Sequence, residues 1–186
     1  MRRELFEGHD PPGVWREFLV SHVGRGGGHP WEGKSLAEIA ALRGQDPYEA
    51  AFDLLQEGEG LVQVMRFETT EAEIMTLLRH PLSLIGSDGS ALAADGPLAT
   101  GHPHPRNFGT FPRVLGRYVR ERGVLSLEEA IRKMTSGPAG RLGLRDRGLL
   151  LPGMWADVVV FNPARIRDTA TYREPRRYPE GIAWVL

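Results

Sequence analysis

Cysteine is absent from these 186 residues, which excludes disulfide bonds and thiolate metal ligands. Long apolar runs are also absent, since none approaches the roughly 20 residues that a helix needs to cross a bilayer. Residues 1–7 contain no apolar stretch of the kind that a secretory signal requires. Together these absences lead us to expect a cytoplasmic protein without a membrane partner.

Neither sign of charge dominates the sequence, whose formal net charge is −1. The charge is uneven: residues 1–100 hold 8 Lys and Arg against 16 Asp and Glu, and residues 101–186 hold 15 against 8. The arginines of the second part are dispersed and accompany no nucleic-acid-binding motif, so we expect no nucleic-acid partner. With 41% hydrophobic and 25% charged residues, the composition predicts one globular domain, or one domain with a small appendage.

Short polar patterns predict several helix starts. Ser35, Asp46, Thr70 and Ser126 are each followed three residues later by a glutamate. A side-chain oxygen before a helix and a carboxylate in its first turn satisfy backbone amides that have no partner within the helix. A further helix is predicted over residues 111–122, because its apolar side chains recur at helical spacing. Its outward-facing residues are predicted to be Arg113, Arg117 and Arg120.

Runs rich in branched and aromatic residues predict the strands. They cover residues 14–21, 61–67, 82–87, 155–163 and 182–186. The strand at 61–67, a helix and the strand at 82–87 follow one another within about thirty residues, which predicts a βαβ unit with parallel strands and an α/β fold. The helix after Ser126 is expected to end at Gly137 and Pro138.

One acidic residue stands where barrel enzymes place a catalytic group. The predicted strand 82–87 runs directly into Asp88, and a long polar loop over residues 89–109 follows. An apolar strand that ends on a carboxylate and a long loop is typical of a catalytic acid or base. Asp88 could merely cap the following turn, because Asp-Gly is ordinary turn chemistry. The residues alone leave both interpretations open.

The same loop carries two further candidates. His102 and His104 imitate a metal-binding His-x-His pair, but the prolines beside them indicate a loop rather than a strand. We therefore expect His104 and Arg106 to line the mouth of a site beside Asp88. The planar guanidinium of Arg106 suits a substrate carboxylate, which it can bind through two parallel hydrogen bonds. A structural salt bridge is the alternative role for Arg106.

Several stretches together resemble one known family. Residues 86–89 and 104–120 are similar to the N-acyl-D-amino-acid deacylases, or D-aminoacylases, of the amidohydrolase superfamily. Residues 33–40, 126–135 and 148–161 agree with the same family. The run 104–120 is specific to these deacylases, whereas the pattern of 148–161 is shared across the superfamily. The resemblance extends from about residue 14 to the end of the sequence.

The resemblance implies a fold and a division of the chain. It implies that residues 1–145 are the C-terminal portion of a (β/α)8 barrel, and that residues 146–186 are part of a small flanking β-sandwich, here truncated. The strands at 61–67 and 82–87 would be the last two barrel strands. Asp88 would then lie at the end of the eighth strand, where the carboxylate contacts the zinc site and carries a proton from the attacking water to the leaving amine.

The sequence also departs from that family in one respect. The histidines that bind zinc in the family lie upstream of the matching region, and this sequence has none of them. We therefore expect a C-terminal fragment of a zinc-dependent N-acyl-D-amino-acid deacylase, inactive and weak in zinc binding when isolated. Asp88 is its expected catalytic and metal-contacting residue, and Arg106 and His104 are its expected substrate-binding residues.

Two other functions remain open at this stage. The pattern of 148–161 also permits an amidohydrolase that acts on cyclic amides, such as a dihydropyrimidinase- or dihydroorotase-like enzyme, although the run 104–120 argues against it. The third hypothesis is a non-catalytic module that acts only in assembly. An incomplete barrel exposes strand edges, so self-association is expected in that case.

Overall fold

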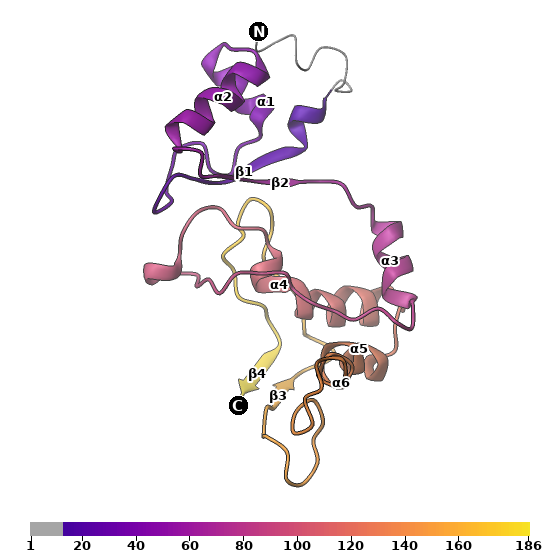
Figure 1. Ribbon diagram of the computed structural model, residues 1–186. Coiled ribbons are helices and arrows are strands. Elements are labelled where there is room, and N and C mark those ends of the chain that lie inside the picture. The colour runs from indigo at the N-terminus through magenta and orange to yellow at the C-terminus, as the bar shows by residue number, and fades with distance from the viewer. Residues whose placement is uncertain (1–12) are drawn as a thin grey trace. The chain divides into compact units, whose positions relative to one another are not determined.

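The computed structural model describes residues 13–186, which form two compact units (Figure 1). The first unit combines the chain up to Glu68 with Leu92–His104, and the second combines Thr69–Ala91 with Pro105–Leu186. The long loop predicted over residues 89–109 is therefore divided between them. No helix in the described part of the chain is long and apolar enough to cross a membrane.

The first unit contains a two-stranded antiparallel sheet covered by two helices (Figure 1). Its elements are η1 (Val14–Arg16), β1 (Phe18–Val23), α1 (Leu36–Arg43), α2 (Pro47–Glu57), β2 (Val62–Arg66) and η2 (Gly96–Leu98). In the sheet Phe18 lies opposite Arg66 and Val23 lies opposite Val62. The core between sheet and helices consists of Val20, Val23, Leu36, Ile39, Ala40, Ala50 and Leu54.

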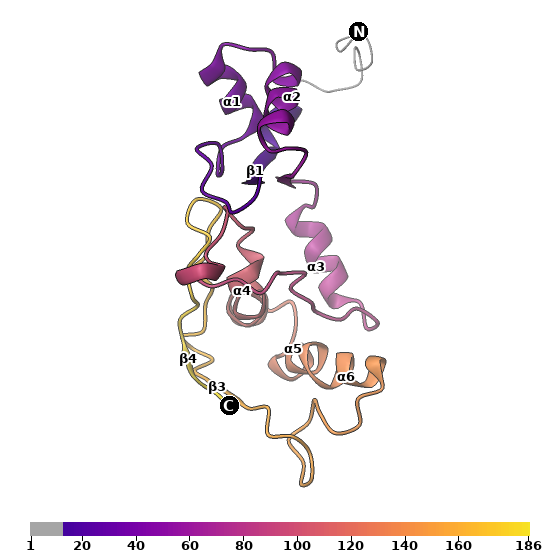
Figure 2. The ribbon, with the colours of Figure 1, turned by 60° about the vertical axis from the view of Figure 1, so that its left-hand side comes forward.

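The second unit is mostly helical and has its own core. Its elements are α3 (Glu71–Arg79), α4 (Arg106–Arg113), the π-helical segment η3 (Val114–Glu121), α5 (Leu127–Met134), α6 (Ser136–Leu142), β3 (Val159–Phe161) and β4 (Ile182–Val185). The two short strands run antiparallel and side by side (Figure 2). The buried core residues are Val114, Leu115, Tyr118, Val124, Leu125, Ala130 and Ile166.

The predicted helix starts are confirmed. The Ser35 hydroxyl accepts from the Glu38 amide, and the Glu38 carboxylate accepts from the Ser35 amide at 2.7 Å, so both orphan donors are satisfied. Thr70 begins α3 with the same reciprocal pair. Asp46 and Ser126 also cap their helices through side-chain oxygens. These local patterns suffice because both partners of each contact lie within one turn of chain.

The strand predicted at 82–87 and its parallel βαβ unit are wrong for this structure. Residues 82–87 have no ladder to any other segment within residues 13–186, and β2 pairs antiparallel with β1 instead. A strand exists only when a neighbour satisfies its backbone groups. The Ile85 amide donates instead to the Lys133 carbonyl, at 3.1 Å. The branched sequence is therefore held against a helix rather than within a sheet.

Other element boundaries also differ from the predictions. Residues 14–16 form a 3-10 turn and the first strand begins at Phe18, while β3 covers only the centre of the predicted strand 155–163. The helix predicted over 111–122 begins already at Arg106. Pro138 does not end a helix but lies in the first turn of α6, where its missing amide has no helical partner to lose.

Candidate functional site

The backbone at Asp88 adopts a conformation that most residues avoid. Its φ is 47°, in the left-handed region, which disfavours side chains other than glycine by roughly 1–2 kcal/mol. Aspartate tolerates this region better than most residues, because its short polar side chain can hydrogen-bond locally. Strain of this kind concentrates at functional sites. The carboxylate projects into solvent with 87% of its side-chain surface exposed.

Arg106 lies beside this carboxylate. Its Nη2 is 2.8 Å from Asp88 Oδ2, and 44% of the arginine side chain is exposed. Arg106 is the first residue of α4, so the helix fixes the position of its backbone. The pair therefore combines a carboxylate that can accept a proton with a guanidinium that can bind an anion. The structure brings together two of the residues that the sequence marks as site candidates, in a salt bridge of the kind given as the alternative role for Arg106.

The turn that carries Asp88 is joined to the start of α4 by a second contact. The Ser90 amide donates to Asn107 Oδ1 at 2.6 Å, and the Gly89 amide donates to the Ser87 hydroxyl at 3.3 Å. A Cβ added to Gly89 would lie 3.1 Å from Asn107 Oδ1 and 3.2 Å from Asn107 Cα. A larger residue at this position would therefore require Asn107 to shift by a few tenths of an ångström.

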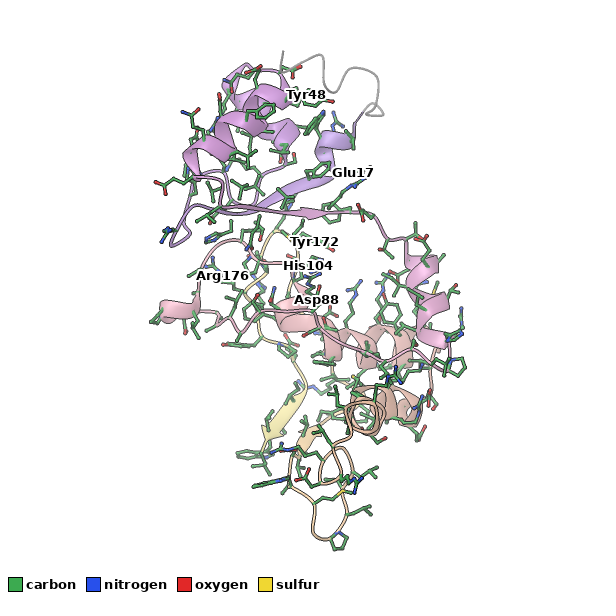
Figure 3. All side chains as sticks on the ribbon, viewed as in Figure 1. Glu17, Tyr48, Asp88, His104, Tyr172 and Arg176 are labelled. Carbon is green, nitrogen blue, oxygen red and sulfur yellow. The ribbon has the colours of Figure 1, made fainter. Side chains whose placement is uncertain are left out.

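The C-terminal segment packs against the other side of α4. Arg113 Nη1 donates to Asp168 Oδ2 at 2.9 Å, and the Phe108 ring meets the Tyr178 ring edge-on at a centroid distance of 5.7 Å. Tyr172 belongs to the same segment (Figure 3). Burial raises the pKa of the Tyr172 phenol, and the positive charges of Arg113 and Arg106 oppose that rise. Tyr172 therefore lies within electrostatic reach of the guanidinium that contacts Asp88.

Helix α4 continues into η3 through a widened turn. Pro112 lies inside α4 and has no amide hydrogen to donate. Its ring crowds the carbonyl of Phe108, which favours a wider helical turn at this point. The η3 arginines predicted to face outward instead make tertiary contacts: Arg117 donates to Glu71 at 2.8 Å, and Arg120 donates to the Ile166 carbonyl at 2.6 Å. These contacts join α3 and the C-terminal segment to the helix that positions Arg106.

His104 belongs to the first unit and is half-buried. In that unit His102 accompanies it: the His102 amide donates to the Ser21 carbonyl at 2.6 Å, and the Ser21 hydroxyl donates to the His102 carbonyl at 2.9 Å. A Cβ on Gly33 would lie 3.0 Å from His102 Nδ1. His102 therefore lies against backbone, in the loop that the flanking prolines predict.

The described residues include no cluster of three or more histidine, cysteine, aspartate or glutamate side chains that could hold a metal ion. The carboxylate of Asp88 forms an ion pair with Arg106. Zinc sites in proteins use several side chains, commonly four in structural sites and three in catalytic ones. The described part of the chain therefore does not fit a zinc ion by itself.

Comparison with known proteins identifies the class. A model of the amidohydrolase family matches residues 21–186, so the chain belongs to the amidohydrolase family. It is 46% identical over 154 residues to N-acyl-D-glutamate deacylase of Alcaligenes xylosoxydans xylosoxydans, a match that covers 83% of this chain and 29% of that relative. The chain thus spans less than a third of the length of this curated relative.

Solved structures of this group are also similar. N-acyl-D-glutamate deacylase of Bordetella bronchiseptica, solved with zinc and a phosphonate mimic of the tetrahedral intermediate, superposes with a TM-score of 0.80 at 39% identity, over 93% of this chain and 34% of that chain. A D-aminoacylase studied for its binuclear metal centre gives a TM-score of 0.76 at 37% identity, over 91% of this chain and 33% of that chain. The predicted resemblance to D-aminoacylases is confirmed, as is a mixed α/β fold of that type.

Three residues with tertiary contacts in the second unit were not predicted from the sequence. Asn107 lies within the stretch that carries the family resemblance, but its contact with Ser90 spans a long loop. Lys133 lies within another resembling stretch and is fully buried. Tyr172 lies in an Arg- and Pro-rich segment without regular structure, where no periodicity indicates burial. The resembling stretches offered a signal for Asn107 and Lys133, whereas nothing in the sequence distinguished Tyr172.

Proposed function

We propose that this chain is the C-terminal part of a zinc-dependent N-acyl-D-amino-acid deacylase, which hydrolyses the amide of an N-acyl-D-amino acid to a carboxylate and a free D-amino acid. The observation that carries the proposal is the contact of Asp88 with Arg106 at 2.8 Å. It joins a proton acceptor to an anion binder, which are the two groups that deacylation of an acylated amino acid requires. The deacylase relatives support the reaction class.

The chain's own residues have separate tasks in this reaction. Asp88 accepts a proton from the attacking water and donates it to the leaving amine, as general base and then general acid. Arg106 binds the α-carboxylate of the substrate through its planar fork. His104 is the second proposed substrate-binding residue. Zinc, when bound, would activate the water and polarise the amide carbonyl, and Asp88 would be a ligand to it from this chain.

The fold and the partners of the whole protein are part of the same proposal. Residues 1–145 would complete a (β/α)8 barrel and residues 146–186 would form part of a flanking β-sandwich. Several large apolar side chains of the second unit are exposed, which supports the proposal that further residues of the whole protein pack over them. They include Leu150, Trp155, Trp184, Val185 and Leu186. The cytoplasm is the proposed location, because the sequence contains no cysteine. Small-molecule N-acyl-D-amino acids are the proposed partners, and self-association would occur through uncovered edges.

A zinc titration with hydrolysis assays on N-acetyl-D-amino acids tests the proposal. The assembled enzyme, meaning this chain together with the residues that hold the zinc, should release free D-amino acid and should not act on the L-enantiomer. This chain alone should show no turnover, because its described residues contain no metal cluster. Robust turnover by the isolated chain would refute the division of the site. Absence of deacylation by the assembled enzyme would refute the function.

A further inference from the structure

A buried lysine lies close to the segment that leads to Asp88. Lys133, on α5, has no exposed surface, although the residues around it in the second unit form an apolar core. Its Nζ donates to the His80 carbonyl at 2.6 Å, to the Ser83 carbonyl at 2.9 Å and to the Ser83 hydroxyl at 2.9 Å. The ammonium therefore donates its three hydrogen bonds to one short stretch of chain, through two backbone carbonyls and one hydroxyl.

This burial is not what folding alone favours. Lysine is almost never fully buried without a partner, because removing an ammonium from water is strongly unfavourable. The Glu129 carboxylate on the same helix forms an ion pair with Lys133 Nζ at 3.8 Å, a separation longer than a hydrogen bond. An apolar side chain of similar volume would fill the site without that penalty. The hydrogen bonds to His80 and Ser83, together with the ion pair to Glu129, satisfy the ammonium at this position.

The backbone of Lys133 contacts the same stretch. The Ile85 amide donates to the Lys133 carbonyl at 3.1 Å, so this residue binds the 80–85 segment from both its side chain and its main chain. That segment has no strand ladder among residues 13–186, as shown above. Asp88 follows Ile85 by three residues.

We propose that Lys133 is a positioning residue for Asp88. It fixes residues 80–85 at one end of the turn, while Asn107 fixes Ser90 at the other. The carboxylate is thereby held in its strained conformation beside Arg106. This inference rests on the proposed deacylase function for its catalytic consequence, whereas the hold on residues 80–85 can be tested separately.

The substitution Lys133→Met tests both parts, because methionine keeps the volume and removes the three donors. Hydrogen exchange of the Ile85 and Ser90 amides in the full chain should accelerate at least about tenfold, while amides of α1 and α2 keep their rates. In the assembled enzyme kcat should fall by roughly 10²-fold, as expected of a small misplacement of a catalytic group, with a smaller change in KM and unchanged zinc content.

The matched control is Lys34→Met. Lys34 is the only other lysine in the sequence, and its Nζ also donates to a backbone carbonyl, that of Pro30 at 3.0 Å, but at the surface. This variant should leave the exchange of Ile85 and Ser90 and the value of kcat unchanged. If Lys133→Met does not fold, Ser83→Ala removes one acceptor and should accelerate exchange of the same two amides to a smaller extent.

Restoration of the amine provides the decisive comparison. Because the chain contains no cysteine, Lys133→Cys introduces a single thiol, which 2-bromoethylamine converts under denaturing conditions to a lysine analogue. Refolded, the analogue should recover slow exchange at Ile85. Unchanged kcat in Lys133→Met, or exchange that rises evenly across the second unit, would overturn the proposal. An inactive unaltered enzyme would instead refute the deacylase function, and the exchange data would still decide the role of Lys133.

Discussion

Asp88 Oδ2 and Arg106 Nη2 lie 2.8 Å apart although a long polar loop separates the two residues in the chain. In this ion pair the Asp88 carboxylate occupies the position at Arg106 that a substrate carboxylate would take, and Arg106 occupies one of the Asp88 oxygens. Under the proposed function, a substrate carboxylate that binds Arg106 would compete with Asp88 and would leave the aspartate oxygen available for proton transfer. Replacing the Asp88 carboxylate at Arg106 by a substrate carboxylate would leave the charge around the guanidinium nearly unchanged. The same pair of residues could therefore serve both substrate binding and proton transfer.

The charge of Asp88 is expected to be essential. In the assembled enzyme Asp88→Asn should lower kcat at least about 10²-fold, because asparagine cannot accept the proton from the attacking water. Steady-state kinetics with an N-acyl-D-amino acid measure this. Asp95→Asn, an aspartate whose side chain makes no capping hydrogen bond at the start of η2, is the control and should keep wild-type rates. Equal losses in both variants would contradict the assigned role.

The left-handed backbone at Asp88 predicts that glycine is tolerated better than alanine at this position. Glycine adopts a φ of 47° without strain, whereas alanine does not. Asp88→Gly should therefore unfold at higher denaturant concentration than Asp88→Ala, with a difference of roughly 1–2 kcal/mol in the free energy of unfolding. Urea unfolding followed by circular dichroism measures the difference. Equal midpoints would show that the turn relaxes in solution.

Arg106 is expected to act on substrate affinity. Arg106→Lys keeps the charge but loses the planar fork, so KM for an N-acyl-D-amino acid should rise roughly tenfold with a smaller change in kcat. The same substitution at Arg141, an exposed arginine on α6, is the control. A substrate analogue whose α-carboxylate is replaced by an amide should show no difference between wild type and Arg106→Lys. A large difference with that analogue would assign Arg106 another task.

Two glycines on helices of the second unit should respond oppositely to alanine. A Cβ on Gly116 would lie 2.7 Å from the Ile166 carbonyl oxygen, so Gly116→Ala should destabilise the chain by about 1–3 kcal/mol. A Cβ on Gly140 meets no atom within 4 Å, and Gly140→Ala should stabilise by up to about 1 kcal/mol through helix propensity. Thermal unfolding of the two variants against wild type tests both signs.

Acid should weaken the contact between α3 and η3. The hydrogen bond from Arg117 holds the pKa of the Glu71 carboxyl below its ordinary value. The unfolded chain therefore binds more protons than the folded one near that pKa, and the contribution of Glu71 is present above about pH 4.3 and lost as the pH falls further. Glu71→Gln should flatten this part of the stability curve. Glu121→Gln, at an exposed site in the same unit, should leave its slope as in wild type.

Features whose interacting residues are close in sequence were predicted correctly, whereas features that depend on residues far apart in sequence were not. The caps at Ser35 and Thr70 were predictable because each partner lies three residues away. The segment 82–87 was predicted as a strand from its branched residues, yet a ladder depends on a neighbour that the segment itself does not encode. Pro138 was misinterpreted because proline both ends helices and begins them, and only the surrounding packing decides.

The candidate site shows the same division. Asp88 and Arg106 were identified from a strand-to-loop pattern and a family resemblance, without knowledge of their separation. Tyr172 and Lys133 depend on contacts between segments far apart in sequence, and no motif spacing describes such contacts. The burial of Lys133 against Ser83 spans 50 residues, so the side chain's surroundings could not be inferred from its neighbours in α5.

The buried amine of Lys133 also allows transient opening of the second unit to be measured by chemical modification. Of the two lysines, Lys34 is accessible and Lys133 is not. An amine-selective acylating reagent will therefore modify Lys34 at once and Lys133 only during the moments when residues 80–83 separate from α5. The ratio of the two modification rates, read by mass spectrometry, gives the frequency of that opening without any engineered label. Substrate analogues that order the Asp88 turn would slow the second rate and leave the first unchanged.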